Sequence, residues 1–125
     1  MNHRPRLLIV EDEPFIRLVL TDALESAGYS IIESSTGQDA IAQLELPGVA
    51  AVVTDIRLGA GPNGWDVARC ARQHNPHVPV VYMSGDSAAD WVTQGVSTSM
   101  MVQKPFAMAQ MITALSSLLV SAALL

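Results

Sequence analysis

The sequence is built from short apolar runs, each followed by polar residues and then by a stretch with helical periodicity. The clearest run spans residues 50–56, is rich in β-branched residues and lies between Pro47-Gly48 and Gly59. A run of this length and composition is typical of a strand that is buried on both faces, as in a parallel sheet. By the same pattern we expect further strands at 7–10, 30–33, 78–83 and 100–102.

The segments between these runs carry apolar residues three and four positions apart, which predicts amphipathic helices. We expect the first helix to begin at Pro14 and to close at Gly28, because proline suits a first helical turn and glycine a helix end. Residues 36–39, Thr-Gly-Gln-Asp, resemble a capping box that opens the second helix. Further helices are expected at 65–74, 88–94 and 108–119. Five strands that alternate with five helices, without an internal repeat, predict one doubly wound α/β domain over residues 1–125.

Composition narrows the range of functions. Half of the 125 residues are apolar and 15% are charged, which is typical of a compact globular protein with a substantial core. The formal net charge of -5 argues against a nucleic-acid partner, which would favour a basic face. Cys70 is the only cysteine, which excludes an internal disulfide and a cysteine-based metal site. We interpret it as a small apolar residue of a helix rather than as a reactive thiol.

The two ends of the sequence bear on its location. The first residues lack the long apolar stretch of a signal peptide, and the apolar run 118–125 is too short to cross a bilayer. We therefore expect a cytoplasmic protein with no membrane partner.

Polar residues that could act together follow four of the expected strands. They are Glu11 and Asp12 within an acidic run, Asp55, Ser84 and Lys104. Because parallel strands end on the same edge of a sheet, these side chains should converge there. A single acid has a simpler explanation, since it can cap the next helix or favour the positive end of the helix dipole. That explanation would suffice for Asp55 alone, but it does not account for the whole group.

The chemistry of these residue types is complementary. Carboxylates gathered at one edge repel one another unless a cation lies among them, and oxygen ligands of this kind suit Mg²⁺. A carboxylate can also act as a covalent nucleophile and form an aspartyl phosphate. A hydroxyl and an ammonium could then bind the remaining phosphoryl oxygens.

Four motifs, taken in order, resemble the receiver domain of two-component response regulators. They are Val-Glu-Asp-Glu at 10–13, Val-Thr-Asp at 53–55, Met-Ser-Gly at 83–85 and Gln-Lys-Pro-Phe at 103–106. The resemblance covers nearly the whole chain and implies a flavodoxin-like three-layer fold, with a five-stranded parallel sheet in the order 2-1-3-4-5. No output domain is expected after the last helix, so the chain is similar to the stand-alone receivers.

The resemblance also implies roles and partners. Asp55 looks like the phosphoacceptor, Ser84 like the switch hydroxyl and Lys104 like the lysine that pairs with the phosphate. A histidine kinase or a histidine phosphotransfer protein is the implied phosphodonor. A cis peptide bond is expected between Lys104 and Pro105. The implied cofactor is Mg²⁺, with Glu11, Asp12, Asp55 and the backbone carbonyl of Arg57 as its protein ligands.

Three features depart from the family pattern. Where members usually carry an aromatic switch residue three positions before the lysine, this sequence has Met101, which puts the usual coupling to Ser84 in question. The loop after Asp55 looks lengthened, with its proline at Pro62, and the helix after Ser84 looks short, with Gly95 interrupting it. Both changes could alter the choice of partner without altering phosphorylation.

Arg57 and Asp86 form a separate hypothesis. They lie two residues beyond Asp55 and Ser84, at positions that tune the lifetime of the aspartyl phosphate in this family. If they pair across the site, they would restrict the access of the hydrolytic water. Two independent solvated charges are an equally good interpretation, because exposed ion pairs contribute little.

Three functions are compatible with these residues. The first is a phosphorylation-driven signalling module with Asp55 as acceptor. The second is a Mg²⁺-dependent phosphatase with Asp55 as nucleophile, although such enzymes normally place a second acid where this sequence has Arg57. The third is a receiver-like interaction module that no longer needs phosphorylation, and Met101 is its support.

The interaction surface should, by resemblance, involve the last helix, the fifth strand and the short helix that contains Trp91. The apolar end Leu124-Leu125 fits a homodimer face, another partner's binding site or a terminus folded against the body.

Overall fold

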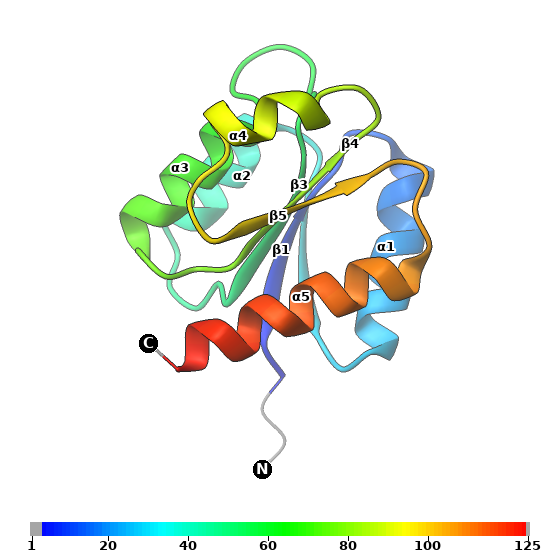
Figure 1. Ribbon diagram of the computed structural model, residues 1–125, viewed down its shortest axis with the longest axis vertical. Coiled ribbons are helices and arrows are strands. Elements are labelled where there is room, and N and C mark those ends of the chain that lie inside the picture. The colour runs from blue at the N-terminus through cyan, green and yellow to red at the C-terminus, as the bar shows by residue number, and fades with distance from the viewer. Residues whose placement is uncertain (1–3, 125) are drawn as a thin grey trace.

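The computed structural model describes residues 4–124, which fold around one five-stranded sheet (Figure 1). Every neighbouring pair of strands is parallel, and the order is β2-β1-β3-β4-β5. This order confirms the flavodoxin-like fold that the resemblance to receiver domains implies. The strands are β1 (Arg6–Val10), β2 (Ser30–Ser34), β3 (Ala51–Asp55), β4 (Val80–Ser84) and β5 (Ser99–Gln103).

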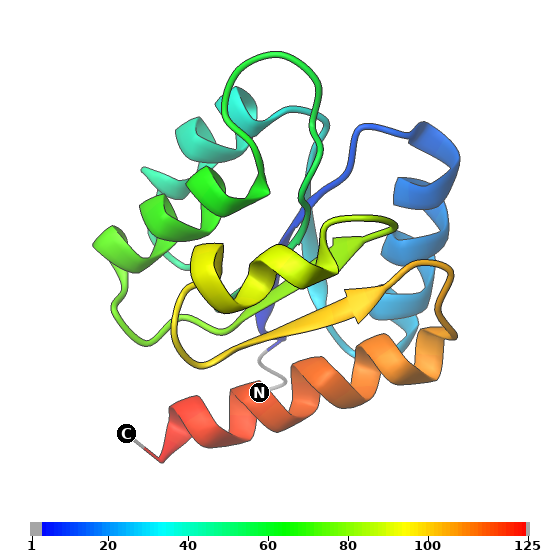
Figure 2. The ribbon, with the colours of Figure 1, turned by 45° about the horizontal axis from the view of Figure 1, so that its top comes forward.

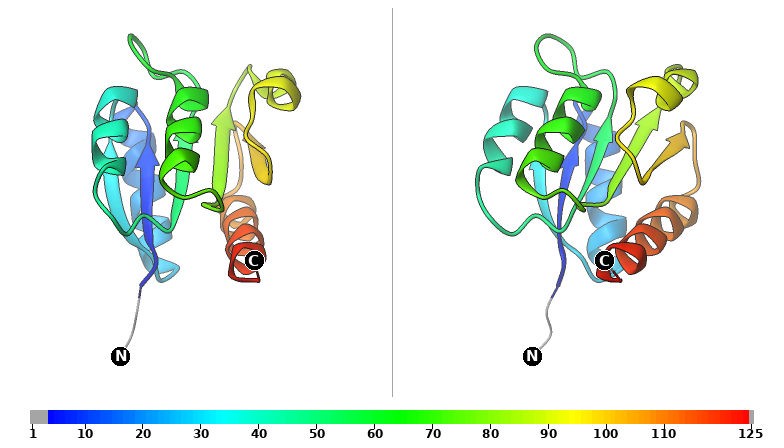
Figure 3. Two further views of the ribbon diagram at one scale, coloured as in Figure 1. Left: turned by 90° about the vertical axis from the view of Figure 1, so that its left-hand side faces the viewer. Right: turned by 60° about the vertical axis from the view of Figure 1, so that its left-hand side comes forward.

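Helices cover both faces of the sheet, which gives the expected three layers (Figure 3). Residues of α1 and α5 pack on one face, and residues of α2 and α3 pack on the other. The helices are α1 (Pro14–Ser26), α2 (Gly37–Leu44), α3 (Gly64–His74), α4 (Trp91–Gln94), which continues the 3-10 turn η1 (Ala88–Asp90), and α5 (Met108–Ala123). Among the described residues, no helix is both long enough and apolar enough to span a membrane.

The alternation of side chains along β1 shows why the strands are apolar throughout. Leu7 and Ile9 face the α1 and α5 layer, whereas Leu8 and Val10 face the α2 and α3 layer. All four side chains are fully buried. Successive residues of a strand point to opposite faces, so a sheet covered on both sides needs apolar residues at every position.

Local capping fixes where the helices begin, next to the carboxyl ends of the strands. The Glu13 carboxylate accepts from the N–H groups of Phe15 and Ile16 at the start of α1. Asn63 and Asp66 form a reciprocal capping box at the start of α3. The box expected at 36–39 forms only in part, because Thr36 caps α2 but the Asp39 carboxylate accepts from the Ser34 hydroxyl instead.

The helix between β4 and β5 is short, as the sequence predicts. Neither η1 nor α4 buries a residue, and α4 ends at Gly95 after a single turn. Side-chain hydrogen bonds hold the segment to the body. Trp91 Nε1 donates to Ser99 Oγ at 2.9 Å, the Val96 N–H donates to the Tyr82 hydroxyl at 3.0 Å, and Arg69 and Arg72 of α3 donate to the carbonyls of Gln94 and Thr98. Figure 2 shows η1 and α4 lying on the β5 side of the sheet.

Candidate functional site

The four chain segments predicted to converge do meet at the carboxyl edge of the sheet. Glu11 and Asp12 follow β1, Asp55 and Ser84 are the last residues of β3 and β4, and Lys104 follows β5. One carboxylate oxygen each of Glu11, Asp12 and Asp55 lie within 4.8 Å of one another. The sequence therefore identified the three members of a carboxylate cluster.

Burial differs across this cluster. Glu11 is fully buried, Asp55 is partly buried and Asp12 is exposed. Glu11 is buried because its backbone extends the hydrogen bonding between β1 and β2: its N–H donates to the Ser34 carbonyl at 3.0 Å. Burial raises the pKa of the Glu11 carboxyl to about 7, and the negative charge of Asp55 adds to this rise, while the hydrogen bond from Lys104 opposes it.

Lys104 supplies the positive charge at the centre of the site and is the only lysine in the sequence. Its Nζ donates to Glu11 Oε1 at 2.7 Å and to Asp55 Oδ2 at 3.1 Å. Burial alone would lower the pKa of Lys104, but the hydrogen bonds and charges of the two carboxylates outweigh it and raise the pKa. The peptide bond between Lys104 and Pro105 is cis, as the resemblance implies.

Asp55 does not cap the following helix. The N-cap of α3 is Asn63, and Asp55 Oδ1 instead accepts from the N–H of Ile56 at 2.9 Å. Its Oδ2 accepts from Lys104. Both oxygens of Asp55 are thus held in place at the strand end, where a phosphoryl group could reach them.

Two glycines that the sequence patterns do not single out allow this close packing. A Cβ on Gly64 would lie 2.1 Å from the carbonyl oxygen of Asp55, so only glycine lets α3 begin against the strand end. A Cβ on Gly37 would lie 2.1 Å from the carbonyl oxygen of Pro62, where the long loop after Asp55 rests on the start of α2. Neither glycine has a positive φ, so the need for glycine here arises from the close approach of backbone that is distant in the sequence.

Ser84 lies at the expected edge, but its hydroxyl is turned toward its own loop. Ser84 Oγ accepts from the N–H groups of Asp86 at 3.2 Å and Ser87 at 2.6 Å. Within residues 4–124, no side-chain hydrogen bond joins Ser84 to Asp55 or Lys104. The hydroxyl oxygen is a double acceptor here, which leaves its proton available for another partner.

Arg57 and Asp86 pair as hypothesised. Arg57 Nε donates to Asp86 Oδ1 at 3.2 Å and Nη2 lies 2.9 Å from Oδ2, which is a bidentate arrangement. The two side chains are 76% and 57% exposed, so the pair lies in solvent and joins the loops that follow β3 and β4. Its effect on hydrolysis stays a prediction, as does the metal-ligand role of the Arg57 carbonyl.

Met101 has an aromatic neighbour on the adjacent strand, which the sequence alone did not indicate. Met101 pairs in register with Tyr82 of β4, and both belong to the apolar layer under α2 and α3. The Tyr82 ring is fully buried and lies 4.6 Å from the ring of Trp65. The aromatic residue that contacts the α4 segment therefore comes from β4 rather than β5.

An apolar hollow of about 390 Å³ adjoins the site between α1 and the loop before α5. Phe15 and Val19 of α1 line one side, and Phe106 and Met108 line the other, with Lys104 at the end nearest the carboxylates. Phe15 is 69% exposed, which is unusual for a side chain of its size. This hollow offers an apolar contact surface that reaches the site at Lys104.

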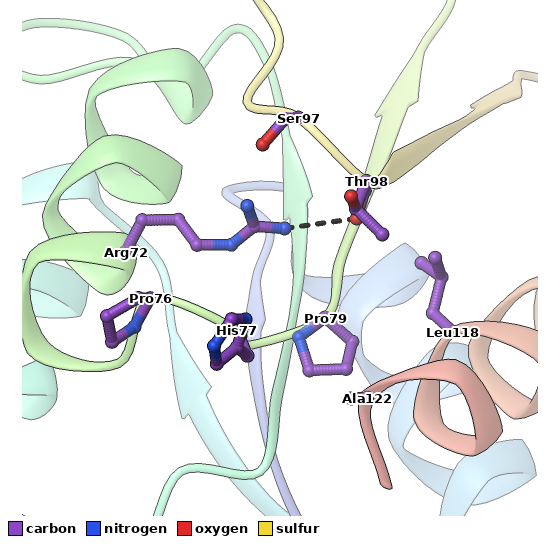
Figure 4. Close-up of a pocket in the computed structure, with 8 residues that line it drawn as sticks. All are labelled: Arg72, Pro76, His77, Pro79, Ser97, Thr98, Leu118 and Ala122. Carbon is purple, nitrogen blue, oxygen red and sulfur yellow. Dashed lines mark hydrogen bonds between the residues drawn. The ribbon is translucent and has the colours of Figure 1, made fainter. Parts of the chain in front are cut away.

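A second hollow, of about 310 Å³, lies at the opposite edge of the sheet, away from the carboxylates (Figure 4). Arg72 spans it, with Nε donating to the Val78 carbonyl at 2.8 Å and Nη2 donating to the Thr98 carbonyl at 3.0 Å. Thr98 adopts a positive φ of 54°, and the arginine bond holds that carbonyl in place. We assign Arg72 a structural role in fixing the loop before β5.

The fold and the carboxylate and lysine cluster define a class of protein, and comparison with known sequences agrees. The chain belongs to the response regulator receiver domain family, whose pattern matches residues 7–116. It is therefore a receiver domain of the two-component response regulators.

Individual relatives make the comparison more specific. The response regulator receiver protein CpdR of Brucella abortus is 25% identical over 119 residues, which cover 94% of this chain and 98% of that protein. The transcriptional regulatory protein TrcR of Mycobacterium tuberculosis is 30% identical over 117 residues, which cover 91% of this chain and 45% of TrcR. The chain thus spans about half the length of the transcriptional regulators it matches.

Solved structures show the same fold. A crystal structure of a response regulator receiver protein from Sinorhizobium medicae is 40% identical and superposes with a TM-score of 0.94. The match covers 96% of this chain and 98% of that one.

Proposed function

We propose that the protein is a phosphoacceptor in which Asp55 receives a phosphoryl group from a phosphohistidine of a histidine kinase or a histidine phosphotransfer protein. The observation that carries this proposal is the convergence of three carboxylates, with oxygens within 4.8 Å of one another, around one lysine 3.1 Å from Asp55. Membership of the receiver family supports it.

The donor set fits a magnesium ion. Three carboxylates faced by one ammonium leave an excess of negative charge at the edge of the sheet, which a divalent cation would compensate. All the candidate donors are oxygens, as Mg²⁺ prefers. Glu11, Asp12 and Asp55 would hold the ion together with the backbone carbonyl of Arg57. When bound, Mg²⁺ would offset the charge of the phosphoryl oxygens and so favour their approach to the carboxylates.

The residues of the chain then have distinct tasks. One oxygen of Asp55 forms a bond to phosphorus as the bond from phosphorus to the donor's imidazole nitrogen breaks, and the electron pair of that bond stays on the nitrogen. The Lys104 ammonium and the Ser84 hydroxyl proton would bind two of the phosphoryl oxygens. Ser84 can do so without losing the hydrogen bonds that its oxygen accepts, because its proton is free.

The apolar hollow between α1 and the loop before α5 is the contact surface we propose for the phosphodonor. Any macromolecular donor must bring its histidine to Asp55 and therefore touches the rim of the site. Phe15, Val19 and Phe106 give that rim an apolar side, where a donor helix could bury its own apolar residues. We also propose that the protein acts in the cytoplasm.

Intact-mass measurement after incubation with a small-molecule phosphodonor tests the function. We expect one phosphoryl adduct that requires Mg²⁺ and disappears in Asp55→Asn. Asp90→Asn, which makes the same change at an exposed position on the short η1 turn, is the matched control and should be phosphorylated normally. The absence of an adduct on folded wild-type protein would refute the proposal and favour an interaction module that does not need phosphorylation.

The phosphatase alternative has a separate test. Such an enzyme would turn over added phosphomonoesters, and the position two residues beyond Asp55 would normally supply its general acid. Here Arg57 occupies that position and pairs with Asp86, so we expect no multiple turnover of a phosphomonoester substrate. Sustained release of phosphate from such a substrate would contradict this expectation.

A further inference from the structure

Asp12 is the carboxylate of the cluster with the least side-chain support. The Glu11 carboxylate accepts from Lys104 and from a backbone N–H, and so does the Asp55 carboxylate. Among residues 4–124, the structure shows no hydrogen bond or ion pair to the Asp12 carboxylate, and the residue is exposed. The position of this carboxylate therefore depends on how firmly the backbone at Asp12 is held.

Arg17 holds the peptide group that leads into Asp12. Its Nη1 donates to the carbonyl of Glu11 at 2.8 Å. That carbonyl and the N–H of Asp12 belong to one planar peptide unit, which moves as a rigid body. A bond that fixes the carbonyl therefore also fixes the plane from which the backbone of Asp12 continues. Because Arg17 lies on α1, the bond ties this helix to the chain that leaves β1.

The guanidinium of Arg17 is itself anchored from a third element. Arg17 Nε lies 3.4 Å from Oε1 of Glu33 on β2, the strand beside β1. The Arg17 side chain is 21% exposed and the Glu33 side chain is 47% exposed, so the guanidinium is largely shielded while its partner reaches solvent. The rigid fork of a guanidinium allows separate nitrogens to meet the two partners. Arg17 thus connects α1, β2 and the loop after β1 at one point.

The bond to the Glu11 carbonyl distinguishes Arg17 from an ordinary surface charge. A partly exposed ion pair such as that with Glu33 contributes little by itself. A short hydrogen bond from a charged donor is stronger, and this one ends on a backbone atom between two members of the carboxylate cluster.

We propose that Arg17 is a positioning residue for the magnesium site, which it serves by fixing the peptide group between Glu11 and Asp12. This inference rests on the proposed function, because it takes the carboxylate cluster to bind Mg²⁺. Mg²⁺ demands near-octahedral geometry with ligands at about 2.0–2.1 Å, so a displaced Asp12 lowers the affinity. Arg17 does not bind the ion, and as a cation it repels it.

Position and charge predict opposite effects when Arg17 is removed. By Coulomb attraction alone, the loss of a positive charge beside the carboxylates would strengthen the binding of a divalent cation. The loss of a group that orients metal ligands instead weakens metal binding, typically by roughly 10- to 100-fold. The direction of the change in Arg17→Met therefore separates a positioning residue from a nearby charge.

Ca²⁺ provides a second readout, which a change of charge or of stability would not give. Ca²⁺ accepts variable geometry and longer ligand distances of about 2.3–2.6 Å. A displaced Asp12 should therefore cost Mg²⁺ more than Ca²⁺, whereas a lost charge changes the affinity for both divalent cations in the same direction and to a similar extent. We expect Arg17→Met to lower the affinity for Mg²⁺ about tenfold and that for Ca²⁺ less than about threefold.

Titration calorimetry of the folded protein with each cation, at about pH 8.5 where Glu11 is ionised, measures these affinities. Arg17→Lys is the second variant, for the case that Arg17→Met does not fold. It keeps the charge but has a single ammonium in place of the fork, so we expect a selective loss of about threefold for Mg²⁺. Arg69→Met is the matched control, because it removes a cation that pairs with Asp66 at 3.2 Å on α3, and it should leave both affinities unchanged.

The outcomes separate this inference from the proposed function. A loss of affinity that is larger for Mg²⁺ than for Ca²⁺ supports the positioning role. Variants that bind Mg²⁺ as tightly as the wild type or more tightly, or that change both affinities by the same factor, would overturn it. A wild-type protein that binds no Mg²⁺ would overturn the proposed metal site and this inference with it.

Phosphorylation at saturating Mg²⁺ completes the test. Arg17 contacts neither Asp55 nor Lys104, so Arg17→Met should still form the phosphoryl adduct at the wild-type level once the metal site is filled. A variant that binds Mg²⁺ but forms no adduct, beside a wild type that does, would show that Arg17 acts in phosphoryl transfer rather than in positioning the metal ligands.

Discussion

Replacing Lys104 with methionine tests how charge is balanced in the resting site. The substitution keeps the length of the side chain and removes the ammonium that lies 2.7 Å from Glu11 and 3.1 Å from Asp55. The Glu11 carboxylate is 1% exposed and the Asp55 carboxylate is 13% exposed, so water cannot replace the lost partner well. We therefore expect a large, pH-dependent loss of stability.

The size of the loss follows from the distances. At an effective dielectric constant of about 20, unit charges at these separations attract by roughly 5–6 kcal/mol per contact, and recovered hydration of the ammonium offsets much of this. We expect a net loss of about 3 kcal/mol in the free energy of unfolding near pH 8.5. Burial raises the pKa of Glu11, and the hydrogen bond from Lys104 opposes this rise. Without Lys104 the pKa of Glu11 will rise further, so its carboxyl will take up a proton more readily on folding.

The sign of the pH dependence is therefore defined. A carboxyl whose pKa is raised by folding contributes most to stability at low pH, and this contribution is lost as the pH rises through the folded pKa. The loss in Lys104→Met should shrink to about 1 kcal/mol near pH 5.5, where Glu11 is neutral. Saturating Mg²⁺ should recover most of the loss at pH 8.5, because the cation replaces the missing positive charge.

Urea unfolding at the two pH values, with and without Mg²⁺, measures these differences. Arg69→Met is the matched control, because it removes a cation from an exposed pair with Asp66 at 3.2 Å and should cost less than about 0.5 kcal/mol at either pH. A loss in Lys104→Met that is equal at both pH values would refute the reasoning. A Mg²⁺ effect no larger than in the wild type would refute it as well.

Three further predictions concern the site and its surroundings. Arg57 and Asp86 bridge the two loops beside Asp55, so Arg57→Ala should open the path of the hydrolytic water and shorten the lifetime of the phosphorylated form several-fold. The rate of dephosphorylation can be measured from the loss of the phosphoryl mass, and an unchanged rate would show that the pair is only a solvated contact. The pKa of Glu11 is about 7, so below neutrality its carboxyl must lose a proton before it can bind Mg²⁺. The affinity for Mg²⁺ should therefore fall roughly tenfold per pH unit below neutrality and level off above it, and titration calorimetry that finds a flat profile between about pH 5.5 and about pH 7 would contradict this. A Cβ on Gly64 would lie 2.1 Å from the Asp55 carbonyl oxygen, so Gly64→Ala should lower the free energy of unfolding by about 3 kcal/mol. Gly85 has open space around it, so Gly85→Ala should change the free energy of unfolding by less than about 0.5 kcal/mol, and equal effects of the two substitutions in urea unfolding would argue against the close packing of α3 on the strand end.

The sequence predicted the fold well because its signals are local and periodic. The run at 50–56 begins with four successive apolar residues because β3 is covered on both faces, and that pattern can be recognised without knowing which strands lie beside it. The edge of the sheet that gathers Glu11, Asp12, Asp55, Ser84 and Lys104 follows from the parallel arrangement alone. The membership of the cluster is therefore predictable from the residues at the strand ends.

What the sequence could not supply is the direction of each side chain. The hydroxyl of Ser84 faces its own loop because two backbone N–H groups of that loop lie within reach, and only the folded backbone determines this. The burial of Glu11 depends on the partner strand β2, which no motif identifies. The hydrogen bond from the Val96 N–H to the Tyr82 hydroxyl joins the loop after α4 to strand β4, so no periodic pattern in the sequence could reveal it.

The location of the phosphoryl group on the chain tests the central claim most directly. Protein phosphorylated in the presence of Mg²⁺ can be reduced with borohydride, which converts an aspartyl phosphate to homoserine, and the modified residue can be identified by peptide mass spectrometry. We predict homoserine at position 55 and at no other acidic residue. Homoserine at position 12, or phosphorylation of a serine such as Ser84 with Asp55 unmodified, would contradict the assignment of Asp55 as the phosphoacceptor.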